Sequence, residues 1–330
     1  MKILLVDADS TIPNLALMKL SAHHKAKGDT VDLVCLNIPY YPNRKKKIYN
    51  IHTSAHDITY CSCIFDGVKE FVKGEGIIFG GTGVSLDVNL PAEVEAMQPD
   101  YTAYPDNDIS YGFITRGCIR NCYFCKVPKK EGGIKQVSTV GEIVKHKQVK
   151  FLDNNILALP EHKQILGELV EKQIRCTFNQ GLDVRLLDEQ NSLLLAKINY
   201  LGEYTFAFDD WKYKSAIESK LPLLAWAKRW QLRFFVYTNP DMEPSNYCQR
   251  IAYLRERKIL PYVMRDIKCW ASPLSDFFVD LASWCNQPNI FKKMDFNLFL
   301  SKRHKNQDRI LESSRLCNYA TNIITEAGKK

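Results

Sequence analysis

From Tyr111 onward the chain alternates short apolar segments with longer amphipathic ones, and this alternation limits its fold more than any other feature. The apolar segments predict strands at 111–115, 149–152, 174–178, 204–208, 232–237 and 260–264. Residues 161–173, 189–198, 215–230 and 245–258, which lie between them, have the apolar spacing of helices. Because successive parallel strands are joined by right-handed crossovers, six such repeats predict a parallel sheet that curls into a partial, TIM-like (β/α)6 barrel.

The segments before Tyr111 predict a second, smaller α/β domain. Strands are expected at 3–6, 31–36, 58–61 and 77–79, with a helix at 14–27. This order indicates a doubly wound, Rossmann-like domain. Three prolines and five acidic residues in 91–108 suggest a linker, and helical patterns at 274–285 and 296–325 follow the last strand. We therefore expect domains at 1–90 and 109–266, joined by the linker 91–108, and a mostly helical extension at 267–330.

Composition narrows the class of protein. The 330 residues fit two domains of ordinary size. With 45% hydrophobic and 25% charged residues, the chain is not of disordered, collagen-like or coiled-coil type. No apolar run is as long as a membrane span, and Met1 leads straight into a strand-like segment with no signal peptide, so a cytoplasmic protein without a membrane partner is expected. The net charge of +8 permits an anionic partner without requiring one.

Three of the eleven cysteines form the most specific motif of the sequence. Cys118, Cys122 and Cys125 stand at C-x3-C-x2-C spacing directly after a predicted strand, a pattern expected only ~0.01 times by chance at this composition. Three thiolates in such a loop can bind three irons of a [4Fe–4S] cluster and leave the fourth iron open. The alternative is a zinc knuckle, which needs a fourth ligand such as Cys61, Cys63 or a histidine. Zinc sites usually carry two matched two-cysteine pairs, and the sequence has no second one.

The segment from Thr115 to Cys125, with Phe124 before the last cysteine, resembles the signature of the radical S-adenosylmethionine (SAM) enzymes. The resemblance covers about residues 111–264, the length of that superfamily's six-stranded partial barrel. It implies that SAM chelates the open iron through its amino and carboxylate groups, with Phe124 packed beside it. Reductive cleavage would then give methionine and a 5′-deoxyadenosyl radical that abstracts hydrogen from a substrate, with a protein such as flavodoxin or ferredoxin as reductant.

The N-terminal domain resembles the cobalamin-binding-like domain that precedes this barrel in one subgroup. Residues 2–7, Gly80-Gly81-Thr82-Gly83 and 90–95 carry the resemblance. Cobalamin-binding members supply an axial histidine from an Asp-x-His-x-x-Gly loop, whereas the corresponding 7–10 here contains no histidine, and His23 and His24 lie in a predicted helix. We expect a vestigial domain without cobalamin, with binding that needs no histidine as the alternative.

Polar residues at the carboxyl ends of the predicted strands are the candidates for binding SAM, because chemistry in such sheets occurs there. The position after the second strand contacts the SAM amino group in the superfamily, and the later ones could hold its carboxylate or ribose. These candidates are Asp153, Asn154, Asn155, Asn179, Gln180, Arg185 and Asp209. Two structural roles compete with binding: the asparagines could cap a helix, and Asp183 could pair with Arg185.

Tyr237 and Arg265, at the ends of the last two strands, are the candidate catalytic residues that contact substrate. A purely structural role is equally compatible with their positions. Cys269, Cys285 and Cys317 are expected to be buried apolar residues, with a second cluster as the alternative. The region from Gln287 holds nine Lys or Arg against four acidic residues, densest at Lys302-Arg303-His304-Lys305, and predicts either a solvated face or contact with nucleic acid.

The sequence therefore predicts a radical SAM enzyme whose substrate and product it does not name. One alternative is a cobalamin-dependent radical SAM methyltransferase acting on a nucleic acid or nucleotide. The other is a non-catalytic iron–sulfur protein that senses redox state or binds nucleic acid. The complete set of six strand–helix repeats favours the enzyme.

Overall fold

The computed structural model describes residues 1–41 and 44–327, with side chains in the last helix as far as Cys317. The chain forms two compact units. Unit 1 contains Met1–Phe113, Arg120–Gly133 and Gly141–Val149. Unit 2 contains Ile114–Ile119, Ile134–Val140 and the chain from Lys150 onward.

A parallel sheet forms the centre of unit 1. Its strands are β1 (Lys2–Asp7), β2 (Thr30–Cys35), β4 (Ile58–Ser62) and β6 (Ile77–Gly80), in the order β2-β1-β4-β6. The chain starts in an inner strand and winds outward from it in both directions, as in a Rossmann-like sheet. The four predicted strands and the Rossmann-like sheet are confirmed.

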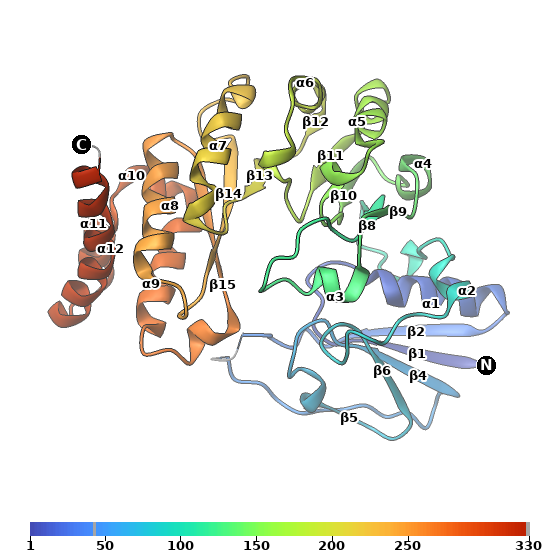
Figure 1. Ribbon diagram of the computed structural model, residues 1–330. Helices are drawn as coiled ribbons and strands as arrows, with labels where there is room; N and C mark the ends of the chain where they lie inside the picture. The colour runs from blue at the N-terminus through green and yellow to red at the C-terminus, as the bar shows by residue number, and fades with distance from the viewer. Residues whose placement is uncertain (42–43, 328–330) are drawn as a thin grey trace. The chain divides into compact units, whose positions relative to one another are not determined.

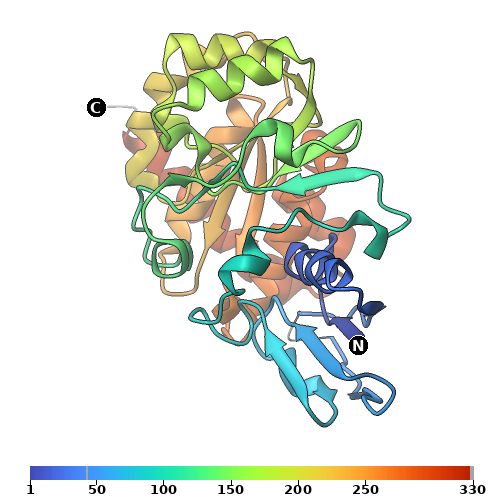
Figure 2. The same cartoon turned by 90° about the vertical axis from the view of Figure 1, so that its right-hand side faces the viewer.

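The inner strand β1 is buried on both faces of this sheet. Ile3 and Leu5 pack with helix α1 (Leu15–Ala26), which lies along one side of the strands in Figures 1 and 2. Leu4 and Val6 pack on the other side, which is covered by loops, the short strands β3 (Tyr49–Asn50) and β5 (Val72–Lys73) and a 3-10 turn at Lys69–Phe71. Burial on both faces explains why β1 is continuously apolar rather than alternating.

Residues 91–108, expected as a linker, are folded against α1 inside unit 1. They contain helix α2 (Ala92–Glu95) and a 3-10 turn at Tyr101–Ala103. The Asp100 carboxylate accepts hydrogen bonds from Ser21 Oγ at 2.6 Å and Lys25 Nζ at 2.7 Å, and these bonds lower its pKa to about 2. The segment is thereby held to unit 1 by specific polar contacts.

Two further sheets carry the strand–helix repeats. One has the order β12-β11-β10-β7, from β7 (Ile109–Gly112), β10 (Gln148–Phe151), β11 (Arg175–Phe178) and β12 (Asn199–Tyr200). The other is parallel and contains β13 (Tyr204–Ala207), β14 (Leu232–Thr238) and β15 (Leu260–Arg265). A parallel bridge between Leu182 and Phe206 joins the end of β11 to β13. The described strands do not close into a barrel.

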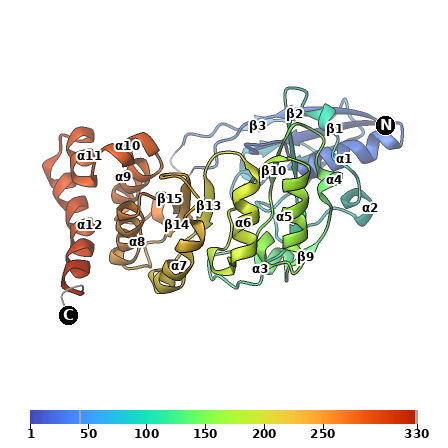
Figure 3. The ribbon, with the colours of Figure 1, turned by 90° about the horizontal axis from the view of Figure 1, so that it is seen from above.

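Helices follow these strands in the predicted order. They are α5 (His162–Glu171), α6 (Glu189–Lys197), α7 (Lys214–Lys220) and α8 (Pro244–Glu256), and Figure 3 shows them along one side of the strands. The shorter helices α3 (Val127–Glu131) and α4 (Val140–Ile143) precede them. Within residues 1–41 and 44–327, no helix combines the length and apolarity that crossing a membrane requires.

Three predicted elements are wrong in their extent. The strand expected at 111–115 ends at Gly112, and Thr115–Arg116 instead form β8, antiparallel to β9 (Lys135–Gln136). The helix expected over 215–230 ends at Lys220 and continues only as a 3-10 turn, because Pro222 has no N–H for the helical ladder. The helix expected over 296–325 is two helices, α11 (Phe296–Arg303) and α12 (Gln307–Ala327).

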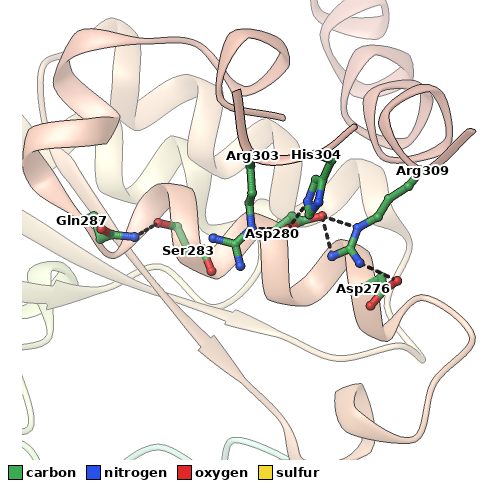
Figure 4. A network of polar contacts seen from close by, with 7 residues as sticks. All are labelled: Asp276, Asp280, Ser283, Gln287, Arg303, His304 and Arg309. Carbon is green, nitrogen blue, oxygen red and sulfur yellow. Dashed lines mark hydrogen bonds and ion pairs between the residues drawn. The ribbon is translucent and has the colours of Figure 1, made fainter. Parts of the chain in front are cut away.

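A buried carboxylate fastens α11 and α12 to α9 (Ser275–Cys285), which is followed by the short α10 (Pro288–Lys293). Asp280 is 0% exposed and accepts from Arg303 Nε at 3.0 Å, His304 Nε2 at 2.9 Å and Arg309 at 3.0 Å, as Figure 4 shows. Two of the four residues in the basic run at 302–305 therefore have a structural use. Contact of this region with nucleic acid stays a prediction.

We predict that Asp280→Ala weakens the packing of α11 and α12 against α9. Removing the carboxylate takes the acidic partner from Arg303 and one of two acidic partners from Arg309, at a cost of ~1–3 kcal/mol since both arginines are partly exposed. Hydrogen exchange measured by mass spectrometry should accelerate in α11 and α12. Asp276→Ala is the matched control, because Asp276 pairs with Arg309 but is 67% exposed and is worth under ~1 kcal/mol. Equal exchange in the two variants would contradict the assignment.

Candidate functional site

The three-cysteine loop connects β8 to α3. Gly117 adopts a left-handed φ of +85°, which a residue with a side chain adopts only at a cost. Cys118, Cys122 and Cys125 are half-buried thiols outside any disulfide. The Cys125 N–H donates to the Cys122 carbonyl at 3.0 Å, and the Val127 N–H donates to Cys125 Sγ at 3.4 Å. A thiol that accepts a backbone N–H is prepared to carry negative charge.

The start of this loop is held from the end of β10. Asp153 is 0% exposed, and its carboxylate accepts from the Thr115 N–H at 2.5 Å, the Thr115 hydroxyl at 2.7 Å and the Ile114 N–H at 3.3 Å. Burial raises the pKa of Asp153 to about 6 despite these bonds. Its oxygens are used within the protein, so Asp153 acts on the site by fixing Thr115, three residues before the first cysteine.

Asn155 is the strand-end residue with an unused polar atom. It is 3% exposed, and its Nδ2 donates to Cys118 Sγ at 3.5 Å. Its Oδ1 is buried and has no hydrogen-bond partner in the part of the chain that the structure describes. A buried acceptor without a donor costs free energy, so this atom fits a ligand that brings an N–H or O–H. Asn154, between the two, is half-buried.

The next strand end contributes to a cavity of about 430 Å³. Asn179 and Gln180 are exposed there, together with Arg233, Phe235 and Tyr262 from β14 and β15. Arg233 pairs with Glu203 at 2.9 Å. This open cavity therefore brings amide, charged and aromatic groups together at one place.

Arg185 is part of a structural pair. Its guanidinium donates to both oxygens of Asp183 at 2.7 and 3.1 Å and stacks over the Tyr213 ring at 4.5 Å. Pairing with Asp183 is the structural role that the sequence analysis gave as the alternative to SAM binding by Arg185. Asp209 lies nearby after β13, and burial raises its pKa to about 6 while Arg250 and Arg185 act in the opposite direction.

Arg250 is the residue that sequence reasoning missed. It is 0% exposed in α8, and its guanidinium donates to the carbonyls of Phe208 at 2.5 Å and Tyr237 at 2.8 Å. It thereby ties the carboxyl ends of β13 and β14, where Asp209 and Tyr237 lie. The sequence does contain one indication of this role: Arg250 lies beside Ile251 on the apolar face of a predicted helix, where a charged residue needs buried partners.

Tyr237 and Arg265 each have a partner from a neighbouring segment. The Tyr237 hydroxyl donates to Asp266 at 2.7 Å and accepts from Asn239 Nδ2 at 3.1 Å. The Arg265 guanidinium lies 4.0 Å from the centre of the Trp270 ring. Phe124 is half-buried and meets Tyr123 edge-on at 5.3 Å. These contacts hold the side chains in place without yet assigning them a ligand.

The cysteines outside the loop are mostly buried. Cys269 and Cys285 are 1% exposed and Cys317 is half-buried. Cys61 and Cys63 are also buried, with their sulfur atoms 3.9 Å apart. Over the described residues, no group of three or more Cys, His, Asp or Glu side chains is already gathered closely enough to hold a metal ion.

The chain matches no protein-family model, and no curated protein is significantly similar to it. Its class is therefore defined by the fold and the site alone. It is an α/β protein with several parallel sheets, a Rossmann-like sheet at its N-terminus and a three-cysteine loop beside a polar strand end.

We predict a pH-dependent contribution of Asp153 to stability. Its folded pKa of about 6 exceeds the ordinary 3.8, so the stability it contributes is full below pH ~4 and is lost as pH rises through ~6. The loss amounts to at most ~3 kcal/mol. The free energy of unfolding, measured with urea between these pH values, should therefore fall more steeply with rising pH for wild type than for Asp153→Asn. If the free energies of unfolding of the two proteins changed in parallel with pH, the raised pKa of the buried Asp153 carboxyl would be contradicted.

We also predict that Arg250 cannot be replaced by an apolar residue. Arg250→Met leaves two buried carbonyls without donors, which should lower the free energy of unfolding by ~2–5 kcal/mol. Arg250→Lys should recover part of the loss, since one ammonium group can reach only some of these acceptors. Denaturant titration measures both variants. If Arg250→Met were as stable as wild type, the carbonyls would not depend on this side chain.

Proposed function

We propose that the protein is a cytoplasmic radical SAM enzyme. The observation that carries the proposal is the loop of Cys118, Cys122 and Cys125, together with the buried, unpartnered Oδ1 of Asn155 beside the first cysteine. A cluster held by three thiolates has one open iron. The unpartnered oxygen supplies an acceptor for an amino group bound next to that cluster.

The strand order supports a partial barrel for this catalytic part. The strands β7, β10 and β11 are neighbours in chain order, as are β13, β14 and β15. The bridge between Leu182 and Phe206 links the two sets. Six strands in sequential order with helices on one side are what a curled parallel sheet requires.

The residues of the loop fit an iron–sulfur cluster in chemistry. Cys118 and Cys125 already accept N–H donors, from Asn155 and Val127, and such hydrogen bonds stabilise cluster thiolates and tune their potential. Cluster binding would draw the three thiolates together and order the loop. When bound, the cluster and SAM would supply radical chemistry that begins with hydrogen abstraction from the substrate.

The other strand-end residues have distinct parts in this proposal. Asp153 fixes Thr115, and the unpartnered Oδ1 of Asn155 would accept a hydrogen bond from the SAM amino group. Of the other polar candidates, Asn179, Gln180 and Asp209 would hold the ribose and carboxylate, and Phe124 would pack beside SAM. Tyr237 and Arg265 lie on the substrate side. A small protein such as flavodoxin or ferredoxin provides the electron.

Cobalamin does not fit the loop after β1. Asp9 accepts N–H groups of Ile64 and Phe65 at 2.8 Å each, and Asp7 accepts from the Tyr104 hydroxyl at 2.7 Å. The loop has no histidine to serve as axial ligand, and His24 is buried in α1 against Asp29 at 2.8 Å. We therefore derive no step through cobalamin.

Anaerobic reconstitution with iron and sulfide tests this function. We expect about four irons per chain and, after reduction with dithionite in the presence of SAM, 5′-deoxyadenosine detected by chromatography. Cys118→Ala/Cys122→Ala/Cys125→Ala should lose both the iron and the product, because it removes every proposed ligand.

Cys35→Ala is the matched control, since Cys35 is an exposed thiol outside the loop. It should retain the iron and the product of wild type. A wild-type protein that binds a full cluster but leaves SAM uncleaved would contradict the catalytic proposal and favour the redox-sensing alternative.

A further inference from the structure

A surface around β3 and β5 in unit 1 carries a concentration of positive charge that the proposed reaction does not use. We call it the β3–β5 surface. Its cations are Arg44, Lys45, Lys46, Lys47, Lys69 and Lys73, of which all but the half-buried Lys46 are exposed. Three exposed carboxylates lie in or next to these segments, Asp66, Glu70 and Glu75, and Asp66 is paired with Lys126. The surface is thus strongly positive in a chain whose overall excess is modest.

The cations of this surface form no close ion pairs, although the charge of Lys46 acts on the buried Asp9 carboxylate. Within residues 1–41 and 44–327, none of the six makes an ion pair with a carboxylate, whereas Lys19, Lys25 and Lys126 in the same unit each do. Neighbouring like charges repel one another and destabilise the folded protein. A partner that brings many negative charges relieves this repulsion.

Aromatic rings lie beneath three of these lysines. Lys46 Nζ is 5.1 Å from the centre of the Phe71 ring, Lys47 Nζ is 4.7 Å from Tyr49, and Lys69 Nζ is 5.1 Å from Phe79. The three rings belong to one cluster, because all pack against the same buried core. The pairing of Tyr49 with Val72 between β3 and β5 fixes their spacing.

This combination indicates the kind of partner. Alternating cations and half-exposed rings allow phosphates to contact the ammonium groups while bases stack on the rings. The charges alone would also suit a lipid surface, and the rings beneath the lysines favour a partner with bases that stack. We propose that the β3–β5 surface binds single-stranded nucleic acid, independently of the proposed cluster chemistry.

Fluorescence anisotropy with the full chain tests the proposal. The probe is a labelled, mixed-sequence RNA of about 20 nucleotides, titrated between about 50 and 200 mM salt. We expect binding that weakens steeply with salt. Lys46→Glu/Lys47→Glu/Lys69→Glu should bind at least ~10-fold more weakly and lower the slope of log K against log salt by ~2, since each lost phosphate contact contributes ~0.7.

Lys27→Glu/Lys197→Glu/Lys228→Glu is the matched control. It makes the same change in charge at three exposed lysines that do not belong to this surface and should weaken binding less than ~3-fold. Circular dichroism of both variants checks that they are folded. The proposal is overturned if wild type shows no salt-dependent RNA binding, if the two variants weaken it equally, or if phosphatidylserine vesicles are bound more tightly than the RNA.

Discussion

The hydrogen bonds between Asp153 and the backbone of Thr115 are the interaction on which the candidate site depends. A carboxylate with 0% exposure costs free energy to bury, and the chain offsets that cost with two N–H groups and a hydroxyl from β8 and the residue just before it. In doing so it fixes the point from which the cysteine loop departs. Asn155, two residues further on, then reaches Cys118 from the same strand end. One turn of chain after β10 thus positions the start of the loop and supplies the neighbour of its first thiol.

Buried charged groups with several partners recur in the structure, and each joins segments distant in the sequence. Arg250 ties the carboxyl ends of β13 and β14, and Asp280 fastens α11 and α12 to α9. Such groups contribute less to stability than their number of bonds suggests, because desolvation opposes the attraction. Their effect is to define which segments meet. In this chain Arg250 holds the strand ends near which candidate residues lie, and Asp280 holds the last two helices.

Much of this arrangement was predictable from sequence, for a physical reason. Strand positions follow from apolar runs, so β1, β11 and β14 were expected within about two residues, and the C-x3-C-x2-C loop follows directly from spacing. The partners of polar side chains were not predictable. Nothing local indicates that Asp153 turns toward Thr115, that Arg250 reaches two strand ends, or that Arg303 and His304 meet a buried Asp280. These contacts depend on tertiary packing between segments far apart in the chain. Pro222 itself indicates a helix end. The apolar spacing on both sides of it nevertheless favoured one continuous helix over 215–230, and that prediction was wrong.

Electron paramagnetic resonance of the reduced, reconstituted protein tests the central claim most directly. The account predicts a [4Fe–4S] signal whose g values shift when SAM is added, because SAM binds the open iron beside Cys118. Asn155→Ala should keep the iron and weaken the SAM-dependent shift, since it removes the unpartnered acceptor next to that thiol. A cluster signal that is unchanged by saturating SAM would contradict the claim that these three cysteines hold a cluster for SAM chemistry.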